Sequence, residues 1–290
     1  MTQKNELVKP FLKWAGGKRQ LLDMILRYVP SEFDTYYEPF LGGGAVLFGL
    51  QPEKAVINDK SWALINCYRV IKDERRLRQL INNLGKHINE ETYYYQIRNM
   101  DRTVEFKGLS RVKKASRTIF LNKTCFNGLF RVNSQGHFNV PFGRYKNPKI
   151  LDEGVLTAVG AYLRENDVTI RCSDFARAVR QAQEGDFVYF DPPYHPASDT
   201  ASFTGYDVGG FGPSDQRRLK REFDRLTARG CKCMLSNSDT PFIRELYGEY
   251  AQTTVSVSAS RAINANGNGR GKVGEVLVMN YEPSSQSYQE

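Results

Sequence analysis

The stretch YYEPFLGGGAVLFGLQPEKAVIND (residues 36–59) predicts the fold of this chain. An apolar run typical of a strand ends in a glycine-rich turn, a short helical run follows, and a second strand ends at Asp59. Glycines let a backbone turn tightly and approach a ligand closely. Asp59 lies 59 − 38 = 21 residues after Glu38, where a doubly wound nucleoside-binding fold places a carboxylate for ribose hydroxyls. The spacing G-G-G, in place of G-x-G-x-x-G, favours a smaller nucleoside cofactor over NAD.

Alternating apolar runs and amphipathic stretches predict an α/β fold with seven short strands. The expected strands are 36–40, 55–58, 168–172, 187–190, 231–236, 252–257 and 276–281. We expect one helix to have Ser214 as its N-cap and to end at Gly230. Residues 61–123 instead predict successive helices without a strand, and SQG at 134–136 suits a hairpin turn. The segment NANGNGRGK (264–272) predicts a loop between the last two strands.

Positive charge is concentrated in one part of the chain. Residues 61–150 hold 18 Lys and Arg against 6 Asp and Glu, so they carry 18 − 6 = +12, and the other 200 residues carry 9 − 12 = −3. A basic block of this kind indicates a polyanionic partner such as nucleic acid, although the charge alone fits a solvated helix face equally well. We expect a helical and hairpin domain at 61–150, inserted into an α/β domain formed by 1–60 and 151–290.

The overall composition is that of an ordinary globular protein, with 40% hydrophobic and 12% aromatic residues. The polar start MTQKNELVKP precedes no long apolar run, so we expect neither a signal peptide nor a membrane anchor and place the protein in the cytoplasm. The five scattered cysteines predict free thiols without disulfides. His87, His137 and His195 are far apart and lack ligand-like spacing, so no metal is expected.

A second glycine turn lies in FLKWAGGKRQL (residues 11–21), immediately before an amphipathic stretch. Lys18 could meet a carboxylate at the start of a helix, and Trp14 could cover an apolar or adenine face. A plain N-terminal helix with a buried Trp is the alternative that this stretch leaves open.

The stretch VYFDPPYH (residues 188–195) carries an acid at the carboxyl end of a predicted strand, where open α/β sheets place their chemistry. Pro192 and Pro193 have fixed φ and no N–H, so Asp191 and the neighbouring carbonyls form a rigid set of acceptors. Such a set suits a substrate with an exocyclic NH₂ group, and Tyr194 offers a ring face for stacking. The held nitrogen could then attack an activated methyl group in line. A turn that merely ends a strand is the alternative.

In this order along the chain, FLKWAGGK, EPFLGGGA, IND, NGLFRVN, FNVPFGRYKNP and DPPY resemble the motifs of the Dam-type DNA adenine-N6 methyltransferases of the D12 class, orphan and restriction-associated enzymes that methylate GATC. The similarity extends from Phe11 to about Tyr281. It implies a Rossmann-like, seven-stranded mixed sheet that binds S-adenosylmethionine, with a helical and hairpin target-recognition domain inserted at 61–150. It also implies a site-specific enzyme that acts on a flipped adenine in double-stranded DNA. We expect a monomer or weak dimer.

The resemblance also implies the roles of individual residues. Those of the catalytic corner are Asp191, Pro192, Pro193 and Tyr194. The expected cofactor-binding residues come from the two glycine turns and from two later acids: Trp14, Ala15, Gly16, Gly17, Lys18, Glu38, Phe40, Gly42, Gly44, Asp59, Asp174, Phe175 and Asp191. Among these, Asp59 matches a ribose ligand, and Asp174 matches the acid near the adenine of the cofactor.

The expected DNA-binding residues lie in the first turn and in residues 123–145: Lys13, Lys123, Phe126, Asn127, Leu129, Arg131, Asn133, Asn139, Pro141, Arg144 and Tyr145. By resemblance, Lys13 touches the first guanine and Arg131 reads the other. The physics agrees, because Arg is the best bidentate reader of a guanine edge. Lys123, Arg144, Lys146 and Lys149 suit phosphate contacts, which supply affinity but little sequence information.

Several other functions remain open at this point. In cytosine-N4 methylation the corner more often begins with Ser, and in RNA or protein-glutamine methylation it usually begins with Asn, so Asp191 favours adenine. Cytosine-C5 methylation needs a Cys nucleophile, and the chain has no Pro-Cys pair. A DNA-binding relative that has lost catalysis is disfavoured by the intact Trp14, Lys18, Asp59 and Asp191.

Overall fold

The structure is a computed structural model that describes residues 4–14, 16, 18, 21–196, 210–259 and 273–283. The predicted loop at 264–272 and two expected cofactor-binding residues, Ala15 and Gly17, lie outside the described residues.

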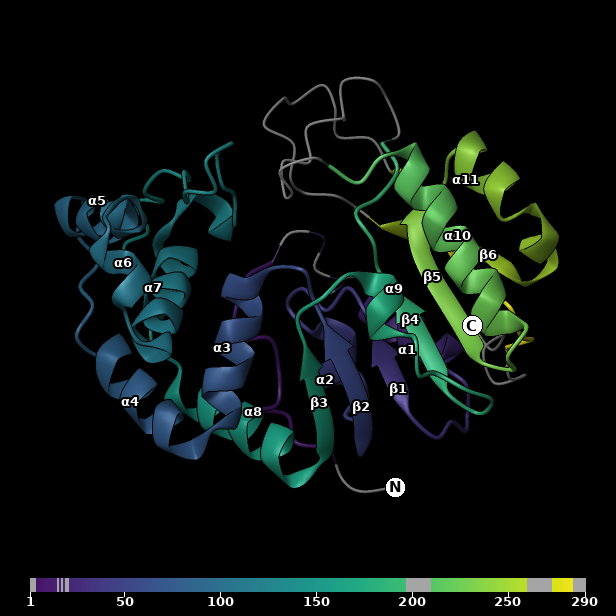
Figure 1. Cartoon of the computed structure of the whole chain (residues 1–290), viewed down its shortest axis with the longest axis horizontal. Helices are drawn as coiled ribbons and strands as arrows, with labels where there is room; N and C mark the ends of the chain where they lie inside the picture. The colour runs from purple at the N-terminus through teal and green to yellow at the C-terminus, as the bar shows by residue number, and fades with distance from the viewer. Residues whose placement is uncertain are drawn as a thin grey trace.

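A seven-stranded sheet of order β3-β2-β1-β4-β5-β7-β6 forms the centre of the molecule (Figure 1). Its strands are β1 (Tyr36–Glu38), β2 (Lys54–Asn58), β3 (Asp167–Arg171), β4 (Phe187–Phe190), β5 (Lys232–Ser238), β6 (Thr254–Ala259) and β7 (Val273–Met279). Strands β1 to β5 pair in parallel, whereas β7 is antiparallel to both β5 and β6. This arrangement confirms the predicted mixed sheet of a Rossmann-like fold. The strand order reverses between β1 and β4, so a ligand-binding crevice is expected beyond their carboxyl ends.

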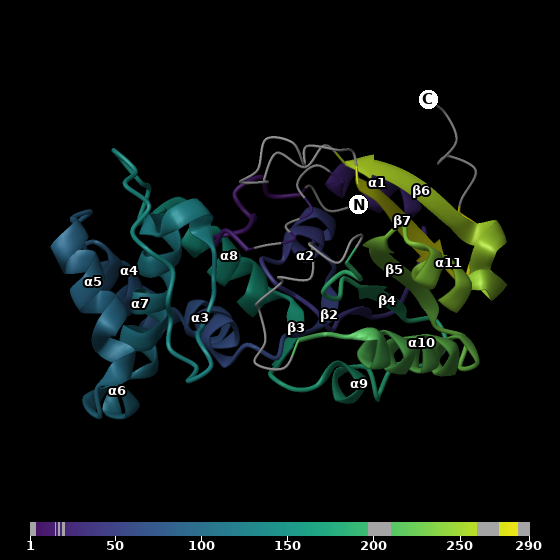
Figure 2. The same ribbon diagram turned by 90° about the horizontal axis from the view of Figure 1, so that it is seen from above.

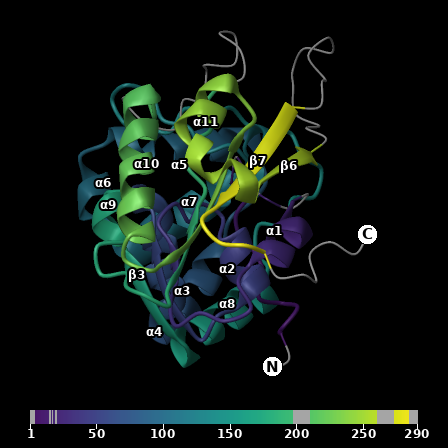
Figure 3. The ribbon, with the colours of Figure 1, turned by 90° about the vertical axis from the view of Figure 1, so that its right-hand side faces the viewer.

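Both faces of the sheet are covered by helices, so successive residues of a strand enter different cores. Tyr36 and Phe187 pack into the core beneath α1 (Leu22–Tyr28) and α2 (Ala45–Leu50), and Tyr37 and Val188 pack on the opposite side. That opposite side is covered by α9 (Phe175–Ala178), α10 (Pro213–Thr227) and α11 (Pro241–Leu246), followed by the 3-10 helix η4 (Gly248–Thr253). Figure 3 shows α9 and α10 on one side of the sheet and α1 and α2 on the other.

Helix α10 begins earlier than its sequence pattern indicates. The prediction that Ser214 is its N-cap is wrong, because the N-cap is Gly212 and Pro213 occupies the first helical position. A proline fits there because its missing N–H would have no partner in the first turn. The backbone N–H of Gly212 donates to the carboxylate of Asp215 at 3.3 Å. The helix is followed, as predicted, by a glycine in the left-handed region, Gly230 at φ +81°.

Residues 61–123, all of which are described, form helices and contain no strand, as predicted. The helices are α3 (Trp62–Lys72), α4 (Glu74–Leu84), α5 (Glu91–Asn99), η1 (Met100–Arg102), α6 (Glu105–Gly108) and α7 (Arg111–Thr124). The outer helices α4 to α7 lie to one side of the sheet (Figures 1 and 2). Helices α3, α4 and the first half of α7 share the main core with α8 (Glu153–Glu165), whereas α5 and the end of α7 enclose a smaller core.

Residues 126–149, here called the recognition segment, begin with the 3-10 helix η2 (Phe126–Gly128) and then double back on themselves. Two isolated antiparallel bridges, Cys125↔Phe142 and Val132↔Phe138, join its two arms. The turn falls at the predicted SQG, where Gly136 has φ +80° and its N–H donates to the carbonyl of Asn133 at 2.9 Å. The segment is therefore a hairpin held by isolated bridges in place of a regular ladder.

Within the described part of the chain, no helix is long and apolar enough to cross a membrane.

Candidate active site

The acid of the DPPY corner meets the lysine of the first glycine turn. Asp191 follows the carboxyl end of β4, and its Oδ1 atom lies 2.7 Å from Nζ of Lys18, a side chain that is only 6% exposed. The same Nζ atom donates to the carbonyl of Gly16 at 3.0 Å and lies 4.4 Å from the centre of the Tyr194 ring. Burial raises the pKa of Asp191, and the ion pair with Lys18 offsets part of that rise.

Two buried amide side chains hold the backbone of the corner. Nε2 of Gln216, on α10, donates to the carbonyl of Pro193 at 2.9 Å, and Oε1 of Gln216 accepts from Nδ2 of Asn237 at 3.1 Å. Oδ1 of Asn237, on β5, accepts from the backbone N–H of His195 at 2.9 Å. Pro192 itself is buried, and no described residue donates a hydrogen bond to its carbonyl.

The ring of Tyr194 is fixed at its far end. Its hydroxyl donates to Oε2 of Glu275 at 2.9 Å, and Glu275, on β7, is 5% exposed. Burial and the nearby carboxylate of Asp191 raise the pKa of Tyr194 well above its ordinary value, so the hydroxyl stays protonated and acts as a donor.

The second glycine turn is tied to the end of β2. The backbone N–H of Gly42 donates to Oδ2 of Asp59 at 3.0 Å, and Oδ1 of Asp59 accepts from the N–H of Ser61 at 2.8 Å. Gly44 has φ +71°, and a Cβ atom there would lie 2.7 Å from the hydroxyl of Tyr68. Only glycine fits at this point of the turn.

Glu38 lies behind the same turn, 2% exposed. Its Oε2 atom accepts from the hydroxyl of Tyr36 at 2.9 Å and from the N–H of Leu47 at 3.1 Å, so it anchors the first turn of α2. Burial raises the pKa of Glu38 to about 8, although both of these hydrogen bonds lower it.

Three aromatic rings pack together beside the glycine turn. Phe40 stacks on Phe175 at a centroid distance of 5.2 Å, and Phe211 packs edge-on against Phe40 at 5.7 Å. Asp174 caps α9 and receives two hydrogen bonds from Arg218, at 3.0 and 2.7 Å. Partial burial raises the pKa of Asp174. The hydrogen bonds from Arg218 and from the N–H of Ala176, together with the charges of Arg218 and Lys60, lower it by more, so the net shift is downward.

The first turn also touches the recognition segment. The Trp14 ring stacks on Phe130 with centroids 5.0 Å apart, and Nζ of Lys13 lies 4.7 Å from the centre of the Tyr145 ring. A cleft of about 380 Å³ lies between these elements, lined by Lys13, Lys123, Tyr145, Lys146, Asn147, Pro148 and Lys149. Four of these seven residues are lysines, so the cleft favours an anion such as a phosphate.

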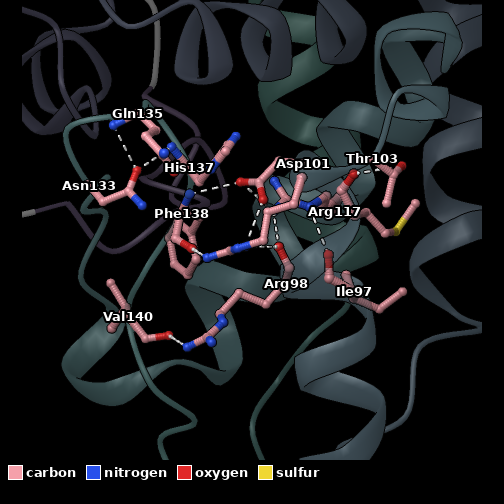
Figure 4. Close-up of polar contacts among 12 residues, drawn as sticks. Ile97, Arg98, Asp101, Thr103, Arg117, Asn133, Gln135, His137, Phe138 and Val140 are labelled. Carbon is pink, nitrogen blue, oxygen red and sulfur yellow. Dashed lines mark hydrogen bonds and ion pairs between the residues drawn. The ribbon is translucent and has the colours of Figure 1, made fainter.

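The other expected DNA-binding residues are spread over the surface of the recognition segment. Phe126, Asn127, Arg131, Pro141 and Arg144 are exposed, whereas Leu129, Asn133 and Asn139 are partly buried. Nε of Arg131 donates to Oδ1 of Asn139 at 2.8 Å. Oδ1 of Asn133 accepts from the N–H of Gln135 at 3.1 Å and of His137 at 2.9 Å, which fixes the turn (Figure 4).

A buried ion pair lies beside the returning arm of the segment and supports it (Figure 4). Oδ2 of Asp101 lies 2.8 Å from a guanidinium nitrogen of Arg117 and accepts from the N–H of Phe138 at 2.8 Å. Both ion-pair side chains are 8% exposed. Arg102 donates to the carbonyl of Phe138 at 3.1 Å, and Arg98 donates to that of Val140 at 3.4 Å.

The family model of the D12 class N6 adenine-specific DNA methyltransferases matches residues 14–263. The chain belongs to this family. It is 46% identical over 284 residues to the type II methyltransferase M1.LlaDCHI of Lactococcus lactis subsp. cremoris. The aligned region covers 97% of this chain and 99% of that protein. It is 44% identical over 292 residues to the type II methyltransferase M.MjaIII of Methanocaldococcus jannaschii, and the aligned region covers 94% of this chain and 99% of that protein. It is also 34% identical over 274 residues to the DNA adenine methylase of Serratia marcescens, and the aligned region covers 93% of this chain and 98% of that protein.

Membership of the D12 family confirms the resemblance seen in the motifs. The match spans both glycine turns, the recognition segment and the DPPY corner, but Lys13 and Glu275 fall outside it. Among the described residues, no group of three or more His, Cys, Asp and Glu could hold a metal ion. The five cysteines are free, and Cys231 and Cys233 pack in the core.

Sequence reasoning missed the residues that hold the site from outside its motifs: Gln216, Asn237, Glu275, Asp101, Arg117 and Asn122. Glu275 is the charged residue of an otherwise apolar strand, which is a weak signal of a buried contact. The helices that carry Gln216, Asp101, Arg117 and Asn122 are rich in polar residues, so their sequences give no such signal. The sequence does not tell which partner each of them meets.

Proposed function

We propose that the chain transfers a methyl group from S-adenosylmethionine to N6 of an adenine flipped out of double-stranded DNA, within GATC. The observation that carries this proposal is the acceptor pair formed by the carboxylate of Asp191 and the carbonyl of Pro192, beside the ring of Tyr194. These two acceptors match the two hydrogens of an exocyclic amino group. The D12 family and the names of the relatives support the choice of adenine in DNA.

The residues at the carboxyl ends of β1, β2 and β4 fit S-adenosylmethionine. Gly16 has φ +75°, and no described atom lies within 4 Å of the position of a Cβ there, so the backbone of this turn is open to a ligand. Asp59 supplies a carboxylate for ribose hydroxyls, and the rings of Phe40 and Phe175 supply apolar surface for an adenine. When bound, the cofactor supplies an electrophilic methyl group.

The residues of the chain then act on the target base. Asp191 and the carbonyl of Pro192 hold the two amino hydrogens, which turns the nitrogen lone pair away from the purine ring and toward the methyl group. As N6 gains the methyl group and the cofactor leaves as its thioether product, the carboxylate of Asp191 could accept the proton that the nitrogen releases and pass it to water. Lys18 favours the ionised form of Asp191, and Tyr194 stacks on the extruded base. Gln216 and Asn237 keep the corner rigid, so the acceptors are already in place when the base arrives.

The recognition segment and its lysines supply the DNA-binding surface of the proposal. Lys123, Lys146 and Lys149 line the cleft that would take a backbone phosphate. Arg131 is exposed on the arm before the turn, where it could reach the edge of a guanine. Because the proposed substrate is DNA inside a cell, we place the protein in the cytoplasm of a bacterium, or of a host when it is encoded by a phage.

The test is to incubate the protein with labelled S-adenosylmethionine and duplexes that contain GATC or a single-base variant, then to identify the modified nucleoside. We expect N6-methyladenine in the GATC duplex only. Label in cytosine would favour N4 chemistry, and equal labelling of GATC and GTTC duplexes would contradict the proposed target. Binding of DNA without any transfer would favour an inactive relative.

A further inference from the structure

Asn122, near the end of α7, joins the first glycine turn to the recognition segment. Its side chain is fully buried. Oδ1 accepts from the backbone N–H of Lys13 at 2.8 Å, and Nδ2 donates to the carbonyls of Lys13 at 2.7 Å and Gly128 at 2.9 Å. One amide group therefore binds both polar backbone groups of Lys13, in the proposed cofactor turn, and one backbone group at the start of the DNA-facing segment.

The two elements are also in direct contact on either side of this amide. The Trp14 and Phe130 rings stack with an interplanar angle of 23°. Gly128 has φ +63°, and a Cβ atom there would lie only 2.4 Å from Cδ of Lys13. Because close-packed groups transmit displacement, the turn and the segment cannot move independently at this junction.

We propose that Asn122 couples the binding of S-adenosylmethionine to the recognition of target DNA. This inference rests on the function proposed above. A ligand that orders the first turn fixes the backbone of Lys13, which fixes Asn122 and, through it, Gly128 and the segment that follows. Asn122 is a positioning residue, because its three hydrogen bonds are all made to the backbone of other residues.

Coupling of this kind has a property that can be measured. If the cofactor raises the affinity for DNA by some factor, the DNA must raise the affinity for the cofactor by the same factor. Couplings between two sites typically amount to about 5–150-fold in affinity. We expect the wild-type protein to fall within this range and a variant without the amide of Asn122 to show a factor near one.

A purely structural role for Asn122 is the alternative, and Asn280 provides a matched control. Its Oδ1 accepts from the N–H of Cys233 at 2.7 Å, and its Nδ2 donates to the carbonyl of Cys231 at 2.9 Å and to Oγ1 of Thr227 at 2.8 Å. It makes the same number of hydrogen bonds through the same atoms. Asn280 directly follows β7, whose end lies beside the start of the antiparallel strand β5, so it lies at the edge of the sheet opposite to Asp191.

The experiment compares the wild-type protein with Asn122→Ala and Asn280→Ala. The dissociation constant of a GATC duplex is measured with and without saturating S-adenosylhomocysteine, and that of S-adenosylhomocysteine with and without the duplex. Urea denaturation of each variant gives its stability. We expect both variants to lose stability, Asn280→Ala to keep the wild-type coupling, and Asn122→Ala to lose it.

Equal coupling in the two variants would overturn the inference, as would a wild-type protein that binds both ligands independently. A wild-type protein that binds neither ligand would overturn the proposed function and the inference with it. If Asn122→Ala does not fold, Phe130→Leu tests the same junction, because it removes the ring stack and leaves Asn122 in place. Reduced coupling in Phe130→Leu supports the inference, and unchanged coupling counts against it.

Discussion

The Nζ atom of Lys18 lies 2.7 Å from Oδ1 of Asp191, in an ion pair that joins the first glycine turn to the DPPY corner. The two residues lie far apart in the sequence, yet this contact brings the proposed cofactor turn to the corner that would hold the target adenine. It also places a positive charge 4.4 Å from the centre of the Tyr194 ring, on which we expect the base to stack.

Replacing Lys18 should change the pH dependence of methyl transfer. The pKa of Asp191 is raised by burial and lowered by Lys18. Activity that needs the ionised carboxylate is present above the pKa of Asp191 and is lost as the pH falls through it. Lys18→Met removes the lowering effect, so the acidic limb of the kcat/KM profile should move to higher pH.

The control for that experiment is Lys232→Met, which removes a lysine whose Nζ donates to the carbonyl of Glu32, away from the corner. Its acidic limb should match that of the wild-type protein. If the acidic limb of the kcat/KM profile does not move in Lys18→Met, the charge of Lys18 does not act on Asp191 during the reaction.

The ring of Tyr194 should matter more than its hydroxyl. Tyr194→Ala removes the stacking surface, which is worth about 1–3 kcal/mol per base, so kcat/KM should fall by about 5- to 150-fold. Tyr194→Phe keeps the ring and loses the hydrogen bond from the hydroxyl to Glu275, so its loss of activity should be smaller. Fluorescence of a duplex with 2-aminopurine in place of the target adenine follows the extruded base. Equal losses in the two variants would argue against stacking.

The buried ion pair beneath the recognition segment should contribute strongly to stability. Asp101→Asn leaves Arg117 buried without its counter-charge, and breaking a buried pair in this way costs about 3–5 kcal/mol. Glu74→Gln breaks the exposed pair between Glu74 and Arg78 on α4 and should have little effect. Urea denaturation measures both. A loss in Asp101→Asn no larger than in Glu74→Gln would contradict the role assigned to the buried pair.

Arg131 and Lys146 should affect DNA binding in different ways. Arg131→Ala should cost about 1–3 kcal/mol on the cognate duplex and relax the preference at one guanine. Lys146→Ala should weaken binding to all sequences alike and reduce the slope of log K against log salt by about 1. Dissociation constants for GATC and single-base variant duplexes over a range of salt concentrations separate the two effects. If Arg131→Ala weakens every duplex equally, Arg131 contacts phosphate and does not read a base.

Glu38 should make folding stability depend on pH. Its pKa in the folded protein is about 8, above that of an unfolded chain, so its contribution is fully present below the unfolded pKa and is lost as the pH rises through 8. Glu38→Gln imitates the protonated acid and should flatten this part of the stability profile. Thermal unfolding of both proteins between pH 5 and about pH 9 measures the difference, which should be largest at high pH. If the stability of the wild-type protein and of Glu38→Gln changes with pH in the same way, Glu38 is ionised in the folded protein.

Features set by neighbouring residues were predictable from the sequence. The strand that ends at Asp191, the glycine turn beside Asp59 and the helices of residues 61–123 depend on local periodicity and on the restricted φ of proline or the freedom of glycine. Even here the start of α10 was misplaced, because Ser214 is a common N-cap residue and the preference of Pro213 for the first helical position outweighed it.

Contacts between distant residues were not predictable in the same way. Glu275 meets Tyr194 across 81 positions, and Asn122 meets Lys13 across 109. A buried Asn or Glu has the same local propensity whichever partner it finds, so its sequence neighbours carry no information about that partner.

By itself, the sequence therefore determined the elements, the order of the motifs and the chemical groups that each motif presents, because these depend on short-range sterics and apolar spacing. Only the tertiary structure decided how the groups are combined: Lys18 beside Asp191, Gln216 on the corner, and Asn122 between the first turn and the recognition segment. The physical reason is that a buried polar group must find a partner, and packing of the whole chain determines which partner lies within hydrogen-bonding distance.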